Sequence, residues 1–224
     1  MFVLKPLPPT LDEGLIKTLV RAEPATIGHF RNSGFMDPGI RAIQSDVRIA
    51  GPAVTVRVPG VDGTMVGHAL GQVRRGDVLV IDRCGDHRHA AFGGLVAYAC
   101  KVAGLAGVII DGMATDIGEV RQYKVPLWCR GLSAVTTKRI GLAGEFCTPV
   151  SCGGVAVNPG DIIIADECGV VVLDRAEAQA AAERAIGMQD AEVASRKRLD
   201  SGEKLPDISG ATKVLQDALA KQKP

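Results

Sequence analysis

An acidic residue, Asp116, stands where its type and position could support metal or substrate chemistry. It lies within residues 107–119, GVIIDGMATDIGE, in which a Val/Ile run between glycines predicts a buried strand that ends at Asp111. Acids just beyond the carboxyl end of such a strand lie where α/β proteins usually place ligands. Alternatively, Asp116 only caps the helix that follows, because Asp116 and Glu119 have capping-box spacing. The stretch by itself supports both interpretations.

A pair of glycines, Gly93 and Gly94, precedes a second predicted helix. Glycines at a helix start leave backbone N–H groups open to a carboxylate or a phosphate, which the helix dipole also attracts. The alternative is that the glycines permit close packing of the helix against its neighbours. The pair therefore indicates either an anion site or a packing contact.

A polar segment from Asp82 to His89 contains two histidines, two arginines and two acids. Such a set could form a metal site, an anion site or an acid–base pair, and the alternative is an ordinary solvated loop. Two further acids, Asp190 and Glu192, lie on a long predicted helix. They are two residues apart and do not share a helical face, so their pattern is typical of solvent-exposed charges.

The composition favours a cytoplasmic globular protein. The chain has 224 residues, of which 46% are hydrophobic and 23% charged, and its net charge of +1 argues against a dedicated nucleic-acid surface. The six cysteines form no CxxC pair, so reduced thiols are expected rather than disulfides or zinc ligands. The N-terminus lacks the apolar region of a signal peptide, and no apolar run reaches the ~18 residues of a membrane span.

The elements that must position these residues alternate between strands and helices, which predicts an α/β fold. No linker is long or biased enough to require two domains, so residues 1–224 are expected to form one domain with a peripheral helical tail from about residue 203. Predicted helices cover residues 10–22 with Thr10 as cap, 62–73, 90–102 ended by Gly104, 116–122, 175–199 and part of 206–221; predicted strands cover 47–58 with an interruption at Gly51-Pro52, 78–82, 107–111, 125–129 and short segments within 149–174.

Several motifs together resemble one protein family. They are the sequences GGLV, GVIIDG followed by Asp116, PLWCRG, PVSCGGVAVNPGD and ADECGVVVLD, and the resemblance covers roughly residues 47–202. The family contains the 4-hydroxy-4-methyl-2-oxoglutarate and 4-carboxy-4-hydroxy-2-oxoadipate aldolases and the regulator of ribonuclease activity A. The resemblance implies an α-β-β-α sandwich of the swivelling-domain type. It also implies homotrimers, often stacked as hexamers, with sites between subunits.

The resemblance also implies roles for individual residues. In the aldolases one Asp, water and the 2-oxo acid hold a divalent metal, usually Mg²⁺ or Mn²⁺, and Asp116 matches this Asp. An acid on the long helix of a neighbouring subunit supports the metal's waters; Glu192 is the match, with Asp190 as the alternative. The substrate carboxylate is held by the backbone amides that match Gly93, Gly94, Leu95 and Val96.

One position departs from the aldolase pattern. The aldolases carry Arg immediately before the metal Asp, where this chain has Thr115. Removing such a charged donor commonly lowers the rate by about 10²–10³. Another cation could replace it: Arg83 is the first candidate and Arg88 the second, and the loop histidines His87 and His89 are further ones.

The resemblance therefore predicts a metal-dependent lyase that cleaves a small 2-oxo acid to release pyruvate, with oxaloacetate decarboxylation as a natural side activity. Hard oxygen ligands suit Mg²⁺ or Mn²⁺ as the cofactor. Two alternatives stay open: a non-catalytic regulator that binds a ribonuclease, and a related reaction on another carbonyl substrate, with the loop 86–89 setting specificity.

Overall fold

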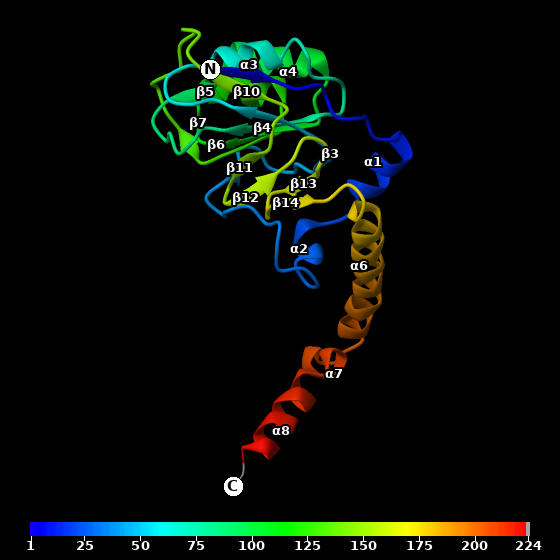
Figure 1. Cartoon of the computed structure of the whole chain (residues 1–224). Helices are drawn as coiled ribbons and strands as arrows, with labels where there is room; N and C mark the ends of the chain where they lie inside the picture. The colour runs from blue at the N-terminus through cyan, green and yellow to red at the C-terminus, as the bar shows by residue number, and fades with distance from the viewer. Residues whose placement is uncertain (223–224) are drawn as a thin grey trace.

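A mainly parallel sheet forms the centre of the computed structural model, which describes residues 1–222 (Figure 1). Its Val- and Ile-rich strands are buried on both faces, as expected for parallel strands covered on each side. The strands in parallel are β3 (Ile49–Arg57), β4 (Val78–Asp82), β6 (Gly107–Asp111) and β8 (Leu127–Cys129), and the sheet is extended by β10 (Gly144–Phe146), β1 (Phe2–Leu4) and β2 (Arg41–Ala42).

Three helices cover one face of this sheet: α3 (Thr64–Ala69), α4 (Gly94–Ala103) and α5 (Ile117–Tyr123). Met65 and Val66 of α3 and Ala97 of α4 join the core that the strands present on this side. Gly104 ends α4 in the left-handed conformation with φ 72°, which confirms its predicted role as a helix terminator.

The opposite face carries two hairpins, β11 (Val150–Cys152) with β12 (Val155–Val157) and β13 (Ile162–Asp166) with β14 (Gly169–Leu173). Strand β3 joins the layers, because its first half pairs with β13 and its second half with β4. An outer layer then packs on β13 and β14; it consists of α1 (Glu13–Leu19), α2 (Pro24–Ile27) and the first half of α6 (Ala178–Asp200). The result is an α-β-β-α sandwich, which confirms the predicted fold class.

A small parallel sheet of β5 (Ala90–Phe92), β7 (Met113–Ala114) and β9 (Gly131–Leu132) lies beside the main one. It corrects the expected helix over residues 90–102: its first residues form β5, and α4 begins only at Gly94. This sheet brings the segments before Gly93 and Thr115 together, because the Thr115 N–H donates to the Phe92 carbonyl at 2.8 Å.

Two other local predictions were wrong. Strand β3 runs through Gly51-Pro52 without interruption, because Gly51 and Pro52 both pair with β13. Helix α1 is capped by Asp12 rather than Thr10: its Oδ1 accepts the amides of Gly14 and Leu15 at 2.8 and 3.2 Å. All six cysteines are free, as predicted.

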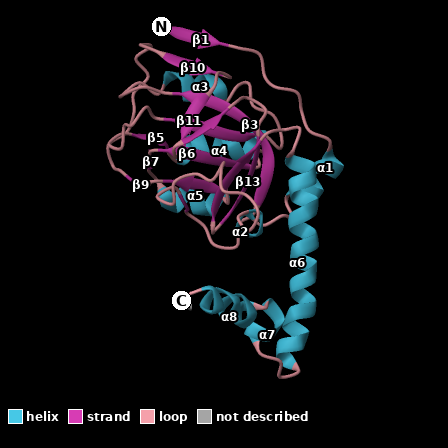
Figure 2. Cartoon of the chain, turned by 60° about the horizontal axis from the view of Figure 1, so that its bottom comes forward, coloured by secondary structure: helices cyan, strands magenta, loops and turns pink. Residues whose placement is uncertain are grey.

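Helix α6 leaves the body and carries α7 (Leu205–Ser209) and α8 (Ala211–Lys221) at its far end (Figures 1 and 2). The first turns of α6 are packed against the body through the buried Ala178, Ala182 and Ala185. Further along the helix, the Gln189 side chain accepts the Glu23 amide and donates to the Arg21 carbonyl. Helix α8 is amphipathic, but no residue of α7 or α8 is buried. None of the helices in residues 1–222 is long and apolar enough to cross a membrane.

Candidate functional site

Asp116 occupies the N-cap position of α5 but does not cap that helix. Its backbone is left-handed, with φ 52°, and its side chain makes no cap hydrogen bond. The carboxylate instead reaches across to the start of α4, where Oδ2 accepts the Gly94 amide at 2.9 Å. Oδ1 accepts a long bond of 3.4 Å from the Thr115 hydroxyl. The carboxylate is therefore directed toward another element, contrary to the capping interpretation.

The glycine pair makes this approach possible. A Cβ at Gly93 would lie 2.6 Å from Asp116 Oδ2 and 2.9 Å from the Thr115 methyl carbon. A Cβ at Gly94 would collide with the Glu119 carboxylate. The packing interpretation of the pair is therefore correct. Because the two glycines have no side chain, the carboxylates of Asp116 and Glu119 can pack against them. The same close packing therefore also shapes the candidate site.

The first turn of α4 presents backbone donors beside Asp116. The Gly94 amide is already used by the Asp116 carboxylate, and the first bond within the helix runs from the Ala97 amide to the Gly93 carbonyl at 2.8 Å. Within residues 1–222 the amides of Leu95 and Val96 have no acceptor. These two N–H groups, at the positive end of the helix dipole, are suited to bind an anion.

A small cavity of about 210 Å³ lies between these elements. It joins the predicted residues Thr115, Asp116 and the α4 start to a segment that the sequence did not single out, Thr136 and Thr137. That segment is attached to β5, because the Thr137 amide donates to the Ala90 carbonyl at 3.0 Å. The cavity is lined by Ala90, Ala91, Phe92, Gly93, Gly94, Leu95, Val96, Thr115, Asp116, Thr136 and Thr137.

Arg83 does not line this cavity, which corrects its place as the first candidate for the missing cation. Its side chain is fully buried, and its guanidinium donates to the carbonyls of Val58 and Gly60 and pairs with Asp86 at 3.2 Å. Burial lowers the pKa of Arg83, while the charge of Asp86 opposes the shift. Arg83 anchors a loop from within the protein, although its sequence neighbours are polar.

The loop that follows Arg83 is organised by Asp86. Burial raises the pKa of this carboxyl group, but hydrogen bonds from the backbone amides of His89 and Arg88 lower it further, and the pKa is about 2. The His89 ring also contacts Asp86, with Nδ1 and Oδ2 2.8 Å apart, and the exposed His87 lies 4.0 Å from Asp111. Neither histidine lines the cavity at Asp116, and the same is true of Arg88.

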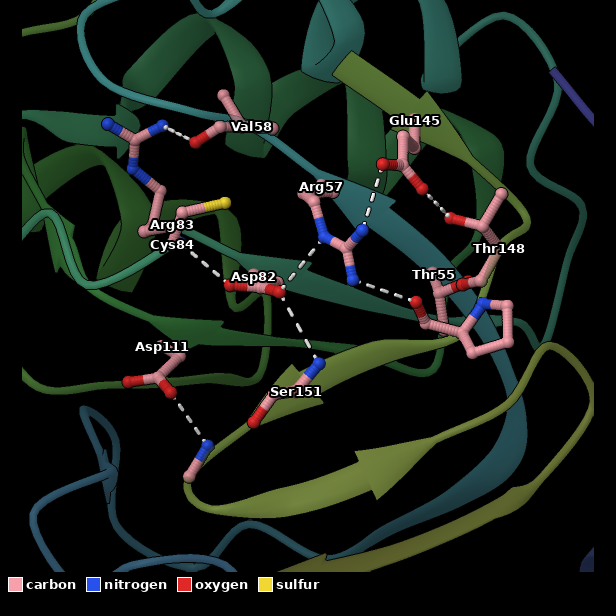
Figure 3. A network of polar contacts seen from close by, with 12 residues as sticks. Thr55, Arg57, Val58, Asp82, Arg83, Cys84, Asp111, Glu145, Thr148 and Ser151 are labelled. Carbon is pink, nitrogen blue, oxygen red and sulfur yellow. Dashed lines mark hydrogen bonds and ion pairs between the residues drawn. The ribbon is translucent and has the colours of Figure 1, made fainter. Parts of the chain in front are cut away.

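A row of ion pairs crosses the carboxyl edge of the main sheet (Figure 3). Asp82 and Asp111 are neighbours in the register of β4 and β6. Asp82 pairs with Arg57 at 3.4 Å and accepts the amides of Cys84 and Ser151, while Asp111 pairs with Arg130 and accepts the Gly153 amide at 2.8 Å. Arg57 in turn pairs with Glu145 at 2.8 Å. These acids at the strand ends are thus engaged in structural contacts.

The two acids on α6 lie apart from this site in their own chain. Glu192 and Asp190 are exposed on the projecting half of the helix. Glu192 forms an ion pair with Arg196 at 3.0 Å, one helical turn further on. The chain does not bring Glu192 to its own Asp116.

A metal at this site would rest on one protein carboxylate. No group of three or more His, Cys, Asp or Glu side chains within residues 1–222 is arranged to hold an ion. The exposed Asp116 carboxylate has no ion-pair partner in the described chain, and the missing Cβ of Gly93 leaves room beside Oδ2. Such a site fits a hard cation that keeps most of its water, as Mg²⁺ does.

Comparisons with known proteins identify relatives of this chain. Residues 21–172 match the RraA-like (aldolase/RraA) family. A putative 4-hydroxy-4-methyl-2-oxoglutarate aldolase of Halalkalibacterium halodurans is 36% identical over 138 residues, 62% of this chain and 65% of that protein, just under two thirds of its length. One of Burkholderia multivorans is 35% identical over 61% of this chain and 82% of its own. The structure of Streptomyces coelicolor RraAS2, an unusual member of the RNase ES inhibitor RraA family, matches with TM-score 0.76 and 29% identity over 84% of this chain and 98% of that one.

Proposed function

The chain belongs to the RraA-like family, and from this premise we propose that it is a divalent-metal-dependent lyase that cleaves or decarboxylates a small 2-oxo acid and releases pyruvate. The observation that carries the proposal is the Asp116 carboxylate, which has no cationic partner in the described chain and lies against the first turn of α4. Relatives named as putative aldolases support the reaction class.

The chain's own residues would bind and orient the substrate. The amides of Leu95 and Val96 would hold its carboxylate at the positive end of α4. The Thr115 hydroxyl, now 3.4 Å from Asp116 Oδ1, could donate to the 2-oxo oxygen instead. The buried Ala91 and Phe92 would exclude water on one side of the reacting atoms.

Asp116 would hold Mg²⁺ or Mn²⁺, and such an ion acts as a Lewis acid that stabilises negative charge on the 2-oxo oxygen. Gly93 would keep the space beside the carboxylate open. In the retro-aldol reaction the C4 hydroxyl would lose its proton and the C3–C4 bond would break to leave a carbonyl at C4. The electron pair of that bond would pass to the 2-oxo oxygen to give the pyruvate enolate, which takes up a proton at C3 to become pyruvate. Glu192 of a neighbouring copy, in a homotrimer or hexamer, would help to remove the proton of the C4 hydroxyl, because α6 carries it away from its own body.

A second candidate function is supported by Thr115. Its neutral hydroxyl provides less stabilisation of developing charge than the arginine of the aldolases. The similarity to a protein of the RNase ES inhibitor family supports a non-catalytic regulator that binds a ribonuclease. Capture of ribonuclease components, together with absence of metal-dependent pyruvate release, would favour this second function.

The first experiment is a pyruvate-release assay. Oxaloacetate and 4-hydroxy-4-methyl-2-oxoglutarate are supplied with Mg²⁺ or Mn²⁺, then with a chelator, and Asp116→Ala is run in parallel. The proposal predicts turnover that both the chelator and the substitution abolish. Turnover that survives both would place the chemistry elsewhere, and absence of turnover on both substrates would reject pyruvate release from these two acids in favour of a different carbonyl substrate or a binding role.

A mixing experiment tests whether two copies share a site. Asp116→Ala and Glu192→Gln subunits should each be inactive or weak alone, whereas mixed oligomers should regain activity in sites that combine the intact residue of each. Arg196→Gln is the matched control, because it breaks the same ion pair and leaves the Glu192 carboxylate in place. If mixing restores nothing while Glu192→Gln alone is fully active, Glu192 has no role in the site.

A further inference from the structure

Two adjoining cavities lie at the turn between β13 and β14, away from the candidate site. The larger has a volume of about 470 Å³ and the smaller about 200 Å³, and both are lined by Ala25 and Cys168. Neither shares a lining residue with the cavity at Asp116. Figure 1 shows α2, which contributes Ala25, on the other side of the body from α4. The two cavities therefore form a separate space.

The wall of the larger cavity carries more negative than positive charge. One of its acids, Glu23, is paired with Arg48 at 2.9 Å, and Arg48 is the one cation among the lining residues. The other acids of the wall have no ion-pair partner within residues 1–222; they are Asp46, Asp166 and Glu167. The negative charge that remains would be complemented by a cationic ligand.

Asp166 is the acid of this wall whose side chain is buried. The residue is only 9% exposed, and its carboxylate accepts one hydrogen bond in the described chain, from the Cys168 amide to Oδ1 at 2.8 Å. Oδ2 is left without a donor. Burial raises the pKa of this carboxyl group, and the Cys168 amide and the charge of Arg48 only partly offset the shift. A cation beside Oδ2 would stabilise the carboxylate, because a buried charge without a partner is costly.

The arrangement of the walls favours an organic cation over a metal ion. Within residues 1–222 no group of three or more His, Cys, Asp or Glu side chains is arranged to hold an ion. An ammonium group has three N–H donors and can bind oxygens that do not converge on one point. The adjoining smaller cavity is mainly apolar, with Pro24, Phe35, Met36 and Val170 in its wall. Together the walls fit an amine that carries an alkyl chain.

We infer that the two cavities bind an aliphatic amine in its protonated form. The ammonium group would donate to Asp166 and Glu167 in the larger cavity, and the alkyl chain would pass Ala25 into the smaller one. A lysine side chain has the same ammonium group, but its alkyl chain leads to a polar backbone that the apolar cavity would not accept. The inference does not depend on the proposed function, because no residue of the candidate site takes part.

Matched ligands test the charge and the chain separately. Calorimetry on the full chain at constant ionic strength compares n-pentylamine with 1-pentanol, which lacks the charge, and with the ammonium ion, which lacks the chain. n-Pentylamine should bind at least about tenfold more tightly than either, because it combines a charged hydrogen bond with buried CH₂ groups. N-Acetyl-lysine methylamide should bind as weakly as the ammonium ion. If it bound more tightly than n-pentylamine, the free amine would be the wrong ligand.

Trp128 provides a second readout at the proposed site. It is the chain's single tryptophan, it is buried, and its Nε1 donates to the Asp166 carbonyl at 2.8 Å. Binding of n-pentylamine should therefore change the tryptophan fluorescence with the same midpoint that calorimetry gives. Calorimetric binding with no change in fluorescence would place the amine elsewhere and overturn the inference.

Conservative substitutions test the acids. Asp166→Asn keeps an oxygen for the Cys168 amide and should weaken n-pentylamine binding by about tenfold or more. Glu167→Gln, on the exposed turn, should weaken it about two- to fivefold, and it keeps the test decisive if Asp166→Asn does not fold. Asp217→Asn is the matched control, because it removes an exposed acid of α8 outside both cavities. Unchanged affinity in the two cavity variants would overturn the inference.

A substitution at Ala25 tests the passage between the cavities. Ala25 is exposed and lines both of them, so a larger side chain should narrow the passage without disturbing the core. Ala25→Leu should weaken n-pentylamine binding about tenfold and leave ammonium binding unchanged, whereas Ala25→Ser should alter neither. Equal affinity of Ala25→Leu and the unchanged protein for n-pentylamine would overturn the inference. So would displacement of n-pentylamine by Mg²⁺ at matched ionic strength, which would assign the acids to a metal.

Discussion

Acids that follow strands in this protein have two different environments. Asp82 and Asp111, at the ends of β4 and β6, each pair with an arginine. Both carboxylates also accept backbone amides, as Figure 3 shows. Asp116, after the short β7, accepts one amide and one long hydroxyl bond and has no cationic partner among residues 1–222. The comparison shows that position at a strand end does not identify a functional acid, whereas an uncompensated charge beside free helix amides is a stronger indication.

The largest expected effect comes from removing the uncompensated charge. Asp116→Asn should lower kcat/KM for pyruvate release by about 10²–10³, because the divalent metal that would stabilise the developing negative charge loses the carboxylate that holds it. Asp116 is exposed and unpaired, so the free energy of unfolding should change by less than about 0.5 kcal/mol. Steady-state kinetics and urea denaturation measure the two quantities. Strong destabilisation would mean that Asp116 is structural, like Asp82.

A substitution at Gly93 should displace the same carboxylate without removing its charge. The Cβ of Gly93→Ala would lie 2.6 Å from Asp116 Oδ2, so the carboxylate must move. A displacement of about 1 Å can cost about 10² in rate, and kcat should fall by this order. Gly118→Ala is the control, because an added Cβ there meets nothing within 4 Å. Equal activity of both variants would show that the position of Asp116 is unimportant.

Much of the fold followed from local patterns, while the site depended on long-range contacts. The Val/Ile runs predicted β4 and β6, and Gly104 predicted the end of α4. The bond from the Gly94 amide to Asp116 joins residues far apart in sequence, so spacing could not distinguish it from a local cap. Arg83 looked available because its neighbours are polar, but the carbonyls that bury it lie on another segment.

Asp82, one of the two paired acids at the strand ends, should matter for stability rather than for activity. Asp82→Ala would leave the amides of Cys84 and Ser151 without this acceptor and would remove one of the two ion-pair partners of Arg57, in a largely buried place. The free energy of unfolding should fall by about 2 kcal/mol, the usual cost of such unsatisfied groups. Activity per folded molecule should be retained. Urea denaturation with activity measured on the folded fraction tests this, and loss of activity at unchanged stability would assign Asp82 to the site.

Acid should weaken the ion-pair row before it affects neutral parts of the fold. The bond from Thr148 lowers the pKa of Glu145; burial opposes this shift, and Arg57 adds to it. A carboxylate with a lowered folded pKa stabilises the protein above its unfolded pKa, and this stability is lost as the pH falls through the folded pKa. Thr148→Val should raise the Glu145 pKa and cost about 1 kcal/mol at neutral pH. Urea denaturation at a series of pH values tests this. If Thr148→Val left the decrease in the free energy of unfolding at acidic pH unchanged, the prediction would be contradicted.

The smallest expected effect is on stability, at two residues with left-handed backbone, one in the ion-pair row and one in the candidate site. Cys84 follows β4 with φ 53°, and Asp116 follows β7 with φ 52°. A non-glycine residue in the left-handed region costs about 1–2 kcal/mol of stability, which glycine avoids. Glycine also makes the unfolded chain more flexible, which lowers the stability by about 0.5–1 kcal/mol. Cys84→Gly should therefore stabilise the protein by about 0.5 kcal/mol with activity unchanged.

Asp116→Gly should gain less stability than Cys84→Gly, because Asp tolerates the left-handed region better than Cys does. It should nevertheless lose activity as Asp116→Asn does. Thermal denaturation of the two glycine variants makes the comparison directly. If Asp116→Gly proved the more stabilising of the two, backbone strain would be concentrated at the candidate site, as it often is where function fixes a conformation that the chain does not prefer.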